Sequence, residues 1–193
     1  MNKFILSLLS IVVSASIVAD GESKLKASVN AGYTSNYIVN GLAKTGSQAF
    51  AGVDIGTEYS GINTYVGAVV LDAGSGLDEL HANVGAGKAI NLFESFSLRG
   101  DAQIFQHQVA AGANSTEGRL TLALNNKYIT PYVVGTYDLD VANTGYSQKG
   151  YIVGLKKSFD VFGVFNLTPS VEYGQMTDYE TASVKLDASK MLW

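Results

Sequence analysis

The segment 24–59 alternates between apolar and polar residues with a period of two, first along 24–37 and again from Ala49 onward. The apolar face of the first run carries Leu25, Ala27, Val29, Ala31 and Tyr33. Side chains of a β-strand point alternately to its two faces, so each run predicts a strand with one apolar and one polar surface. Each run, at about a dozen residues, is longer than an ordinary globular strand and close to the length with which a tilted strand crosses a bilayer.

The same alternation recurs along the rest of the chain and predicts about ten strands. The expected strands are 24–37, 49–60, 62–71, 77–90, 95–109, 119–125, 128–139, 151–159, 165–173 and 182–189. Tight turns alternate with longer loops, the asymmetry of barrels with short periplasmic turns and long outer loops. The sequence therefore predicts an all-β fold, an antiparallel up-and-down transmembrane β-barrel with both termini in the periplasm.

Alternation alone leaves open which face points inward, because a soluble barrel such as a lipocalin is apolar inside. Strand length favours the membrane barrel, and so does the hydrophobic end of the chain, Met191-Leu192-Trp193. Aromatic residues also end the apolar face, as in membrane barrels. They are Tyr33, Tyr37, Tyr59, Phe96, Tyr137, Phe159, Phe165 and Tyr173. The register of the last strand would place Leu192 outward, so either a bulge near 189–190 or a last residue outside the strand would accommodate Trp193.

Residues 1–19 form a separate segment. Lys3 is followed by an almost uninterrupted apolar run, 4–13, and by small residues up to Ala19. This pattern predicts a secretory signal peptide cleaved after Ala19 or Ala15, because the run is shorter than the ~20 residues of a spanning helix. Residues 20–193 then form one outer-membrane barrel domain.

Composition agrees with an exported barrel. The formal net charge is −4 and no basic run is present, so the sequence shows no footprint for nucleic acid. The chain has no cysteine, and a closed barrel satisfies its backbone groups without disulfides. The expected surroundings are outer-membrane lipid.

Four segments carry a resemblance to a known family. The segment 32–42, Gly-Tyr-Thr-Ser-Asn-Tyr-Ile-Val-Asn-Gly-Leu, resembles the opening motif of the proteobacterial TorF family of porins. The segments 51–54 and 61–67 look like the second strand and turn of that family, and 182–190 is similar to its closing strand. Asn40 stands where the family usually has Arg, and Trp193 replaces the usual terminal Phe. The resemblance implies a porin-like pore.

The polar face is the place where function is expected, because it lines the barrel. The candidate lumen or constriction residues are Glu79, His81, Arg99, Asp101, His107 and Arg119. If a tight turn at 91–94 sets the register, paired positions sum to about 185. This places His107 near Glu79 and His81 near Gln103, and the next loop brings Arg119 near His107.

The same reasoning makes Arg99 face Gly85 and Gly87, which leave room for it, and brings Lys185 near Glu172. One interpretation is a network of ion pairs that fills a narrow lumen, since interior charges must be paired or hydrated. The other is a constriction that selects permeants by charge. A barrel of about ten strands is expected to leave a narrow pore or a plugged one.

The sequence therefore predicts a small pore for hydrophilic solutes or ions. The alternative is a non-conducting barrel whose outer loops, 39–47, 110–115 and 140–147, bind a partner or stabilise the envelope. Catalysis is not expected, because no Gly-x-Ser-x-Gly motif occurs and both histidines lie in mid-strand. No metal-ligand spacing or cofactor motif is apparent. The permeant and the oligomeric state stay open.

Overall fold

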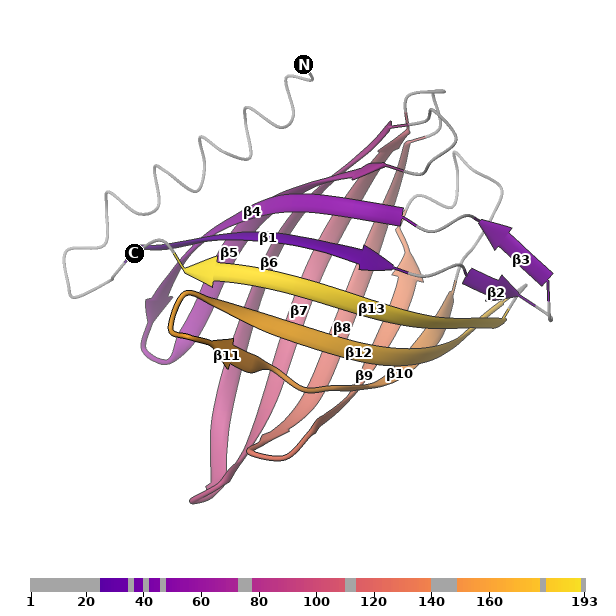
Figure 1. The fold of residues 1–193 in the computed structure, drawn as a ribbon. Coiled ribbons are helices and arrows are strands. Elements are labelled where there is room, and N and C mark those ends of the chain that lie inside the picture. Colours follow the sequence, from indigo (N-terminus) through magenta and orange to yellow (C-terminus); the bar gives the residue numbers. More distant parts are fainter. Residues whose placement is uncertain are drawn as a thin grey trace.

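The computed structural model describes residues 25–34, 37–39, 42–45, 48–72, 78–109, 114–139, 149–177 and 180–191. These ranges form one antiparallel sheet that closes on itself (Figure 1). The expected signal peptide at 1–19 lies outside the described residues. In the ranges given above, no helix is long and apolar enough to cross a membrane.

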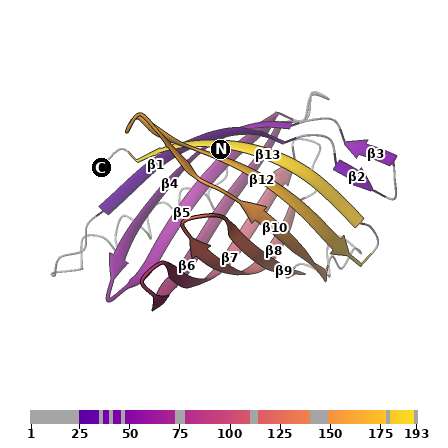
Figure 2. The same ribbon diagram turned by 60° about the horizontal axis from the view of Figure 1, so that its bottom comes forward.

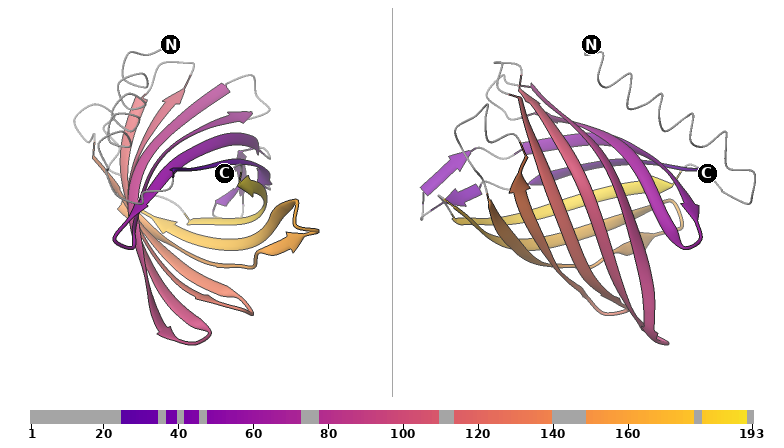
Figure 3. Two further views of the ribbon diagram at one scale, coloured as in Figure 1. Left: turned by 90° about the vertical axis from the view of Figure 1, so that its left-hand side faces the viewer. Right: turned by 180° about the vertical axis from the view of Figure 1, so that it is seen from behind.

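Ten long strands make up the closed ring, which confirms the predicted all-β barrel. They are β1 (Leu25–Thr34), β4 (Gln48–Tyr59), β5 (Ile62–Asp72), β6 (Asp78–Phe93), β7 (Phe96–Val109), β8 (Asn114–Asn126), β9 (Thr130–Asp138), β10 (Lys149–Lys156), β12 (Phe165–Met176) and β13 (Glu180–Met191). The ring closes where β13 pairs with β1, from Ser28–Met191 to Thr34–Lys185. This pairing is regular across 189–190, so the bulge considered there is absent, while Trp193 lies outside the described residues. The rear view in Figure 3 shows the strands crossing the wall obliquely.

A short hairpin, β2 (Tyr37–Val39) and β3 (Leu42–Thr45), follows β1 (Figure 2). The sequence predicted one strand to residue 37 and then a loop to residue 47. The end of the strand is wrong, since β1 ends at Thr34 and the hairpin lies within the predicted loop region, whereas the end of the loop agrees with the start of β4 at Gln48. β1 pairs with β13 only as far as Lys185, which leaves the N-terminal part of β13 with a free edge. β2 pairs with that edge at Ala182 and supplies partners to its backbone.

The predicted strand 151–159 is divided into β10 and β11 (Phe159–Val161). Both halves pair with β12, and between them Lys157 N–H donates to the Pro169 carbonyl at 3.2 Å. Pro169 has no N–H to return to Lys157, so the ladder is interrupted at this point.

Short connections lie at one end of the barrel, here called the turn end, and the opposite end is the loop end. The β4–β5 turn uses Ser60 at φ 54° and Gly61 at φ 75°. The β11–β12 turn uses Phe162 at φ 56° and Gly163 at φ 69°. Two successive residues with positive φ match the twist of an antiparallel hairpin. At the β8–β9 turn, Asn126 Oδ1 accepts hydrogen bonds from the next two free N–H groups, those of residues 128 and 129.

The two faces of the sheet settle the orientation that alternation left open. Large apolar side chains are exposed on the outside of the wall, among them Val53, Leu120, Leu122, Val171 and Val184. Polar side chains are buried on the inside, namely Asp101, Thr136, Asp138, Ser170 and Ser183. A soluble barrel would have an apolar interior and a polar exterior. The apolar exterior and polar interior found here are those of a membrane barrel.

Exposed aromatic side chains mark both ends of this apolar exterior. The turn end carries Tyr59, Phe93, Phe96, Tyr128, Phe159 and Phe162, and the loop end carries Tyr33, Tyr137, Tyr151 and Tyr173. Such girdles sit at the two membrane interfaces. Of the other predicted members, Phe165 is half-buried and the Tyr37 side chain lies outside the description.

Leu122→Arg tests this orientation. Leu122 is the middle of three outward leucines on β8, so the substitution would place a charge near the centre of the hydrocarbon layer. We expect a loss of about 2–4 kcal/mol in the free energy of unfolding, measured by urea titration in lipid vesicles. Tyr128→Arg at the turn end is the control, with an expected loss of about 0–1 kcal/mol. Equal tolerance of both substitutions would indicate an exterior that faces water.

Candidate functional site

The first polar cluster of the inner wall joins β5 and β7 across the strand between them. Tyr65 Oη donates a hydrogen bond of 2.5 Å to Asp101 Oδ1, and Gln103 Nε2 donates to Tyr65 Oη. Arg99 Nη2 lies 3.2 Å from Asp101 Oδ2. A phenol and a guanidinium therefore both bind one buried carboxylate, and such charge-assisted hydrogen bonds are the stronger kind.

Two glycines of the intervening strand β6 make this contact possible. A Cβ at Gly85 would lie 2.5 Å from Tyr65 Oη, and a Cβ at Gly87 would overlap Asp101 Oδ2. The sequence predicted that Arg99 occupies this space, which is wrong. The observed register pairs Arg99 with Ala89 and puts Asp101 opposite Gly87.

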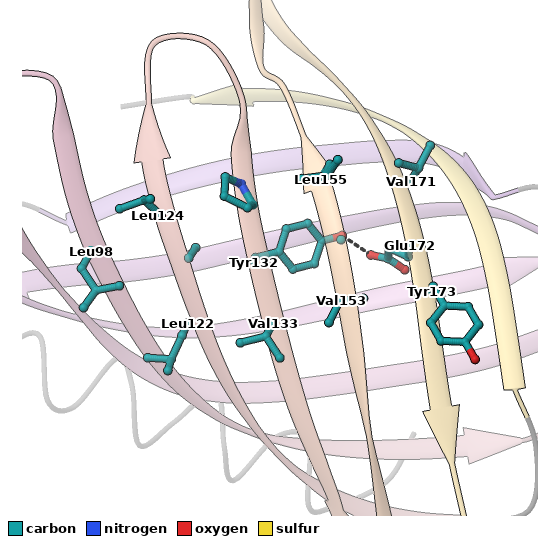
Figure 4. A pocket seen from close by; sticks show the side chains of 13 residues that line it. Leu98, Leu122, Leu124, Tyr132, Val133, Val153, Leu155, Val171, Glu172 and Tyr173 are labelled. Atoms are coloured by element: carbon teal, nitrogen blue, oxygen red, sulfur yellow. Dashed lines mark hydrogen bonds between the residues drawn. The ribbon is translucent and has the colours of Figure 1, made fainter.

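The second polar cluster repeats this arrangement around Glu172 of β12. Tyr132 Oη of β9 donates a 2.5 Å hydrogen bond to Glu172 Oε1 past the intervening strand β10 (Figure 4). Lys185 Nζ lies 2.6 Å from Glu172 Oε2, and Ser183 Oγ donates to the same oxygen at 3.3 Å. Here Gly154 makes room, since a Cβ on it would overlap the Tyr132 ring. The predicted proximity of Lys185 and Glu172 is confirmed.

A third inward carboxylate, Asp54 of β4, lies among amides. Asn30 Nδ2 donates a 2.7 Å hydrogen bond to Asp54 Oδ2. A Cβ at Gly67 would overlap both Asp54 Oδ1 and Asn83 Oδ1. Glycine again leaves the space in which polar side chains of neighbouring strands meet.

Arg119 of β8 forms its ion pair along its own strand. Arg119 Nε lies 2.5 Å from Glu117 Oε1, two residues away. The guanidinium carbon lies 4.1 Å from the centre of the Phe105 ring on β7, which is a cation–π contact. The head group is therefore held against the wall by a carboxylate and an aromatic face.

The two histidines are brought opposite each other in the β6–β7 ladder. His81 pairs with His107, and Glu79 pairs with Val109, so Glu79 and His107 lie diagonally across the ladder; the sequence predicted His107 near Glu79 and His81 near Gln103. The prediction for His81 is wrong because the turn falls after Phe93, later than the predicted turn at 91–94, and because the register shifts between residues 91 and 93. The side chains of Glu79 and His107 lie outside the described residues.

The predicted cluster of Glu79, His107 and Arg119 does not assemble around Arg119. Backbone pairing places Arg119 opposite Gln103, and His107 opposite Ser115, near the loop end of the same ladder. Of the remaining candidates, Arg99 and Asp101 lie in the first cluster. His81 of β6 lies on the inner face of the barrel.

Sequence reasoning missed the two tyrosines that organise the clusters. The signal that could have identified them is an inward tyrosine whose in-register neighbour is glycine. Tyr65 pairs with Gly85, and Tyr132 pairs with Gly154. Such a pair leaves space for a ring to lie over the neighbouring strand and to reach the next one.

A groove of about 750 Å³ lies on the opposite, outward side of β7–β12 (Figure 4). Its side chains are mainly aliphatic, including Leu98, Leu122, Val133, Val153 and Val171. These residues belong to the apolar exterior, so the groove faces lipid and is not the candidate site. Among the residues that the structure describes, no group of three or more His, Cys, Asp or Glu could hold a metal ion.

Gly154→Ala tests the packing of the second cluster. The new methyl group would displace the Tyr132 ring and weaken its bond to Glu172, with an expected loss of about 1–3 kcal/mol in unfolding free energy. Gly135→Ala is the matched control, because its Cβ would lie 4.0 Å from the nearest heavy atom. We expect that control to stay within about 0.5 kcal/mol of the wild type in the same urea titration. Similar losses in both variants would contradict the assigned role of Gly154.

No family model matches the chain, and no curated protein matches it. Solved structures do resemble it. The β domain of the Bordetella autotransporter BrkA is similar at 10% identity and a TM-score of 0.56, covering 86% of this chain and 99% of that one.

Two further structures match with lower scores. The KdgM porin has 13% identity and a TM-score of 0.46, over 83% of this chain and 97% of that one. Neisserial surface protein A has 10% identity and a TM-score of 0.41, over 88% and 97% of the two chains. The likeness to the BrkA β domain concerns the fold alone. The chain has the barrel fold of bacterial outer-membrane proteins.

Proposed function

We propose that the chain is an exported outer-membrane protein of the TorF type that forms a narrow pore for small hydrophilic solutes or ions. The observation that carries this proposal is the solvent exposure of a charged side chain on the inner wall. Arg99 points inward, yet its side chain is 48% exposed. A charged group that is inside the barrel and still in contact with solvent indicates a water-accessible interior.

The positions of the residues joined by ion pairs support the same conclusion. Arg99 meets Asp101 and Arg119 meets Glu117, in each case two residues away on the same strand. Such bridges run along the wall and do not cross the bore. Salt bridges that joined opposite walls would instead fill the lumen.

The number of strands limits the size of the pore. Eight strands enclose an interior that side chains can just fill, and 16–18 strands leave a broad channel. A ring of ten strands that carries Tyr65, Tyr132 and Phe105 on its inner face therefore leaves a narrow passage. The expected permeants are ions and small polar molecules.

Single-channel recording tests the proposal. The protein, purified in detergent from membranes of expressing bacteria, is added to a planar lipid bilayer. We expect discrete conductance steps. Arg119→Ala removes a positive charge from the inner wall and leaves Glu117 without its partner, so we expect the steps to become more cation-selective.

Lys88→Ala is the matched control, because Lys88 pairs with the outward Ile62 and its charge lies on the exterior. It should leave conductance and selectivity unchanged. If the protein shows the heat-dependent gel mobility of a folded barrel but gives no conductance steps, a pore is excluded. The non-conducting barrel with binding loops would then be the better proposal.

A further inference from the structure

Carboxylates outnumber basic groups on the described inner wall. The inward acids are Asp54, Glu58, Asp101, Glu117, Asp138, Asp160, Glu172 and Asp187, and the inward bases are Lys26, Arg99, Arg119, Lys156 and Lys185. Counting charges alone would therefore predict a pore that prefers cations. The depth at which each charge lies leads to the opposite expectation.

In three ion pairs of the inner wall the base is more exposed than its acid, and in a further inward pair, Lys26–Glu58, both side chains are 45% exposed. The exposed fractions of the side chains are 48% for Arg99 against 6% for Asp101. They are 31% for Arg119 against 19% for Glu117. They are 26% for Lys185 against 13% for Glu172. The carboxylates lie within the wall, and the longer basic side chains carry their charge toward the water of the bore.

Neutral donors hold two of these carboxylates in the wall. Asp101 accepts a hydrogen bond from Tyr65, and Glu172 accepts hydrogen bonds from Tyr132 and Ser183. These donors stabilise the ionised carboxylate without adding positive charge. Because the carboxylate does not depend on its basic neighbour alone, the base keeps part of its capacity to bind a third group.

Arg99 of β7 and Lys156 of β10 lie on either side of Tyr132 of β9. Arg99 pairs with Ala123 of β8, which in turn pairs with Tyr132. The Lys156 ammonium lies 5.2 Å from the centre of the Tyr132 ring, and Lys156 shares the partner Ser170 with Lys185. Three inward bases thus lie at similar levels of β7, β10 and β13 along one part of the inner wall.

We propose that the pore prefers small anions and that Arg99, Lys156 and Lys185 form the surface they meet. A mobile anion between these groups offsets the repulsion of Arg99 and Lys156. Since the charges lie in a narrow bore with low-dielectric walls, their field is stronger there than at an open surface. The inference rests on the proposed pore and names the chemical class of its permeant.

The reversal potential in a KCl gradient across the bilayer tests the proposal with the same purified protein. We expect the wild type to pass chloride more readily than potassium. The variant Arg99→Gln/Lys156→Gln should shift the reversal potential toward the value for potassium and lower the chloride-to-potassium permeability ratio. Lys156→Gln alone should give a smaller shift in the same direction, which keeps the test possible if the double variant folds poorly. Lys88→Gln on the exterior is the control and should match the wild type.

Each outcome separates the two proposals. If the wild type gives conductance steps but is more permeable to potassium than to chloride, the anion preference is overturned and the proposed pore is retained. Steps that favour chloride equally in the wild type and in the folded Arg99→Gln/Lys156→Gln variant would overturn the assignment to these residues. Absence of steps from folded wild-type protein would overturn the pore itself and the anion preference with it.

Discussion

The pairing of β13 with β1 is the constraint on which the rest of the structure depends. In hydrocarbon there is no water to satisfy a free N–H or C=O, so a sheet that spans a membrane has to close. The closing ladder runs from Ser28–Met191 to Thr34–Lys185, and it joins the two ends of the described chain. Each of the other long strands then has a partner on both sides. Large apolar side chains can therefore face outward without exposing a sheet edge to lipid.

Closure turns the interior into the place where polar groups have to be accommodated. A ten-strand ring has little room, and the Tyr65 and Tyr132 rings fit because the adjacent strand carries glycine opposite each of them. Each ring lies over such a glycine and its hydroxyl reaches a carboxylate on the strand beyond. The glycines are thus spatial requirements of the wall, and the buried carboxylates have donors where a bare wall would leave them unsatisfied.

The strand pattern and both faces could be predicted from the sequence, because the period of two survives along almost the whole chain. The pairing register was less predictable than the strand pattern, because it depends on where a turn falls and on local shifts of the ladder. The β7–β8 ladder places Arg119 opposite Gln103, four residues from His107, so the expected cluster does not form around Arg119. Lys185 and Glu172 were predicted correctly, since their ladder between β12 and β13 runs without a shift. The hairpin β2–β3 was missed because its pairing with β13 is a matter of tertiary contact and leaves no alternation in the sequence.

The inner wall also shows why the number of acidic and basic residues does not by itself determine the electrostatic field inside a barrel. Asp and Glu have short side chains, and here hydroxyls of other strands and bases of the same or a neighbouring strand bind them. Arg and Lys have long, flexible side chains that bury their methylene groups along the wall and extend the charged end into water. The sign of the charge nearest to the water of the interior therefore depends on side-chain length and on the donors behind each carboxylate. In the pore proposed above, those two factors would outweigh the excess of acids.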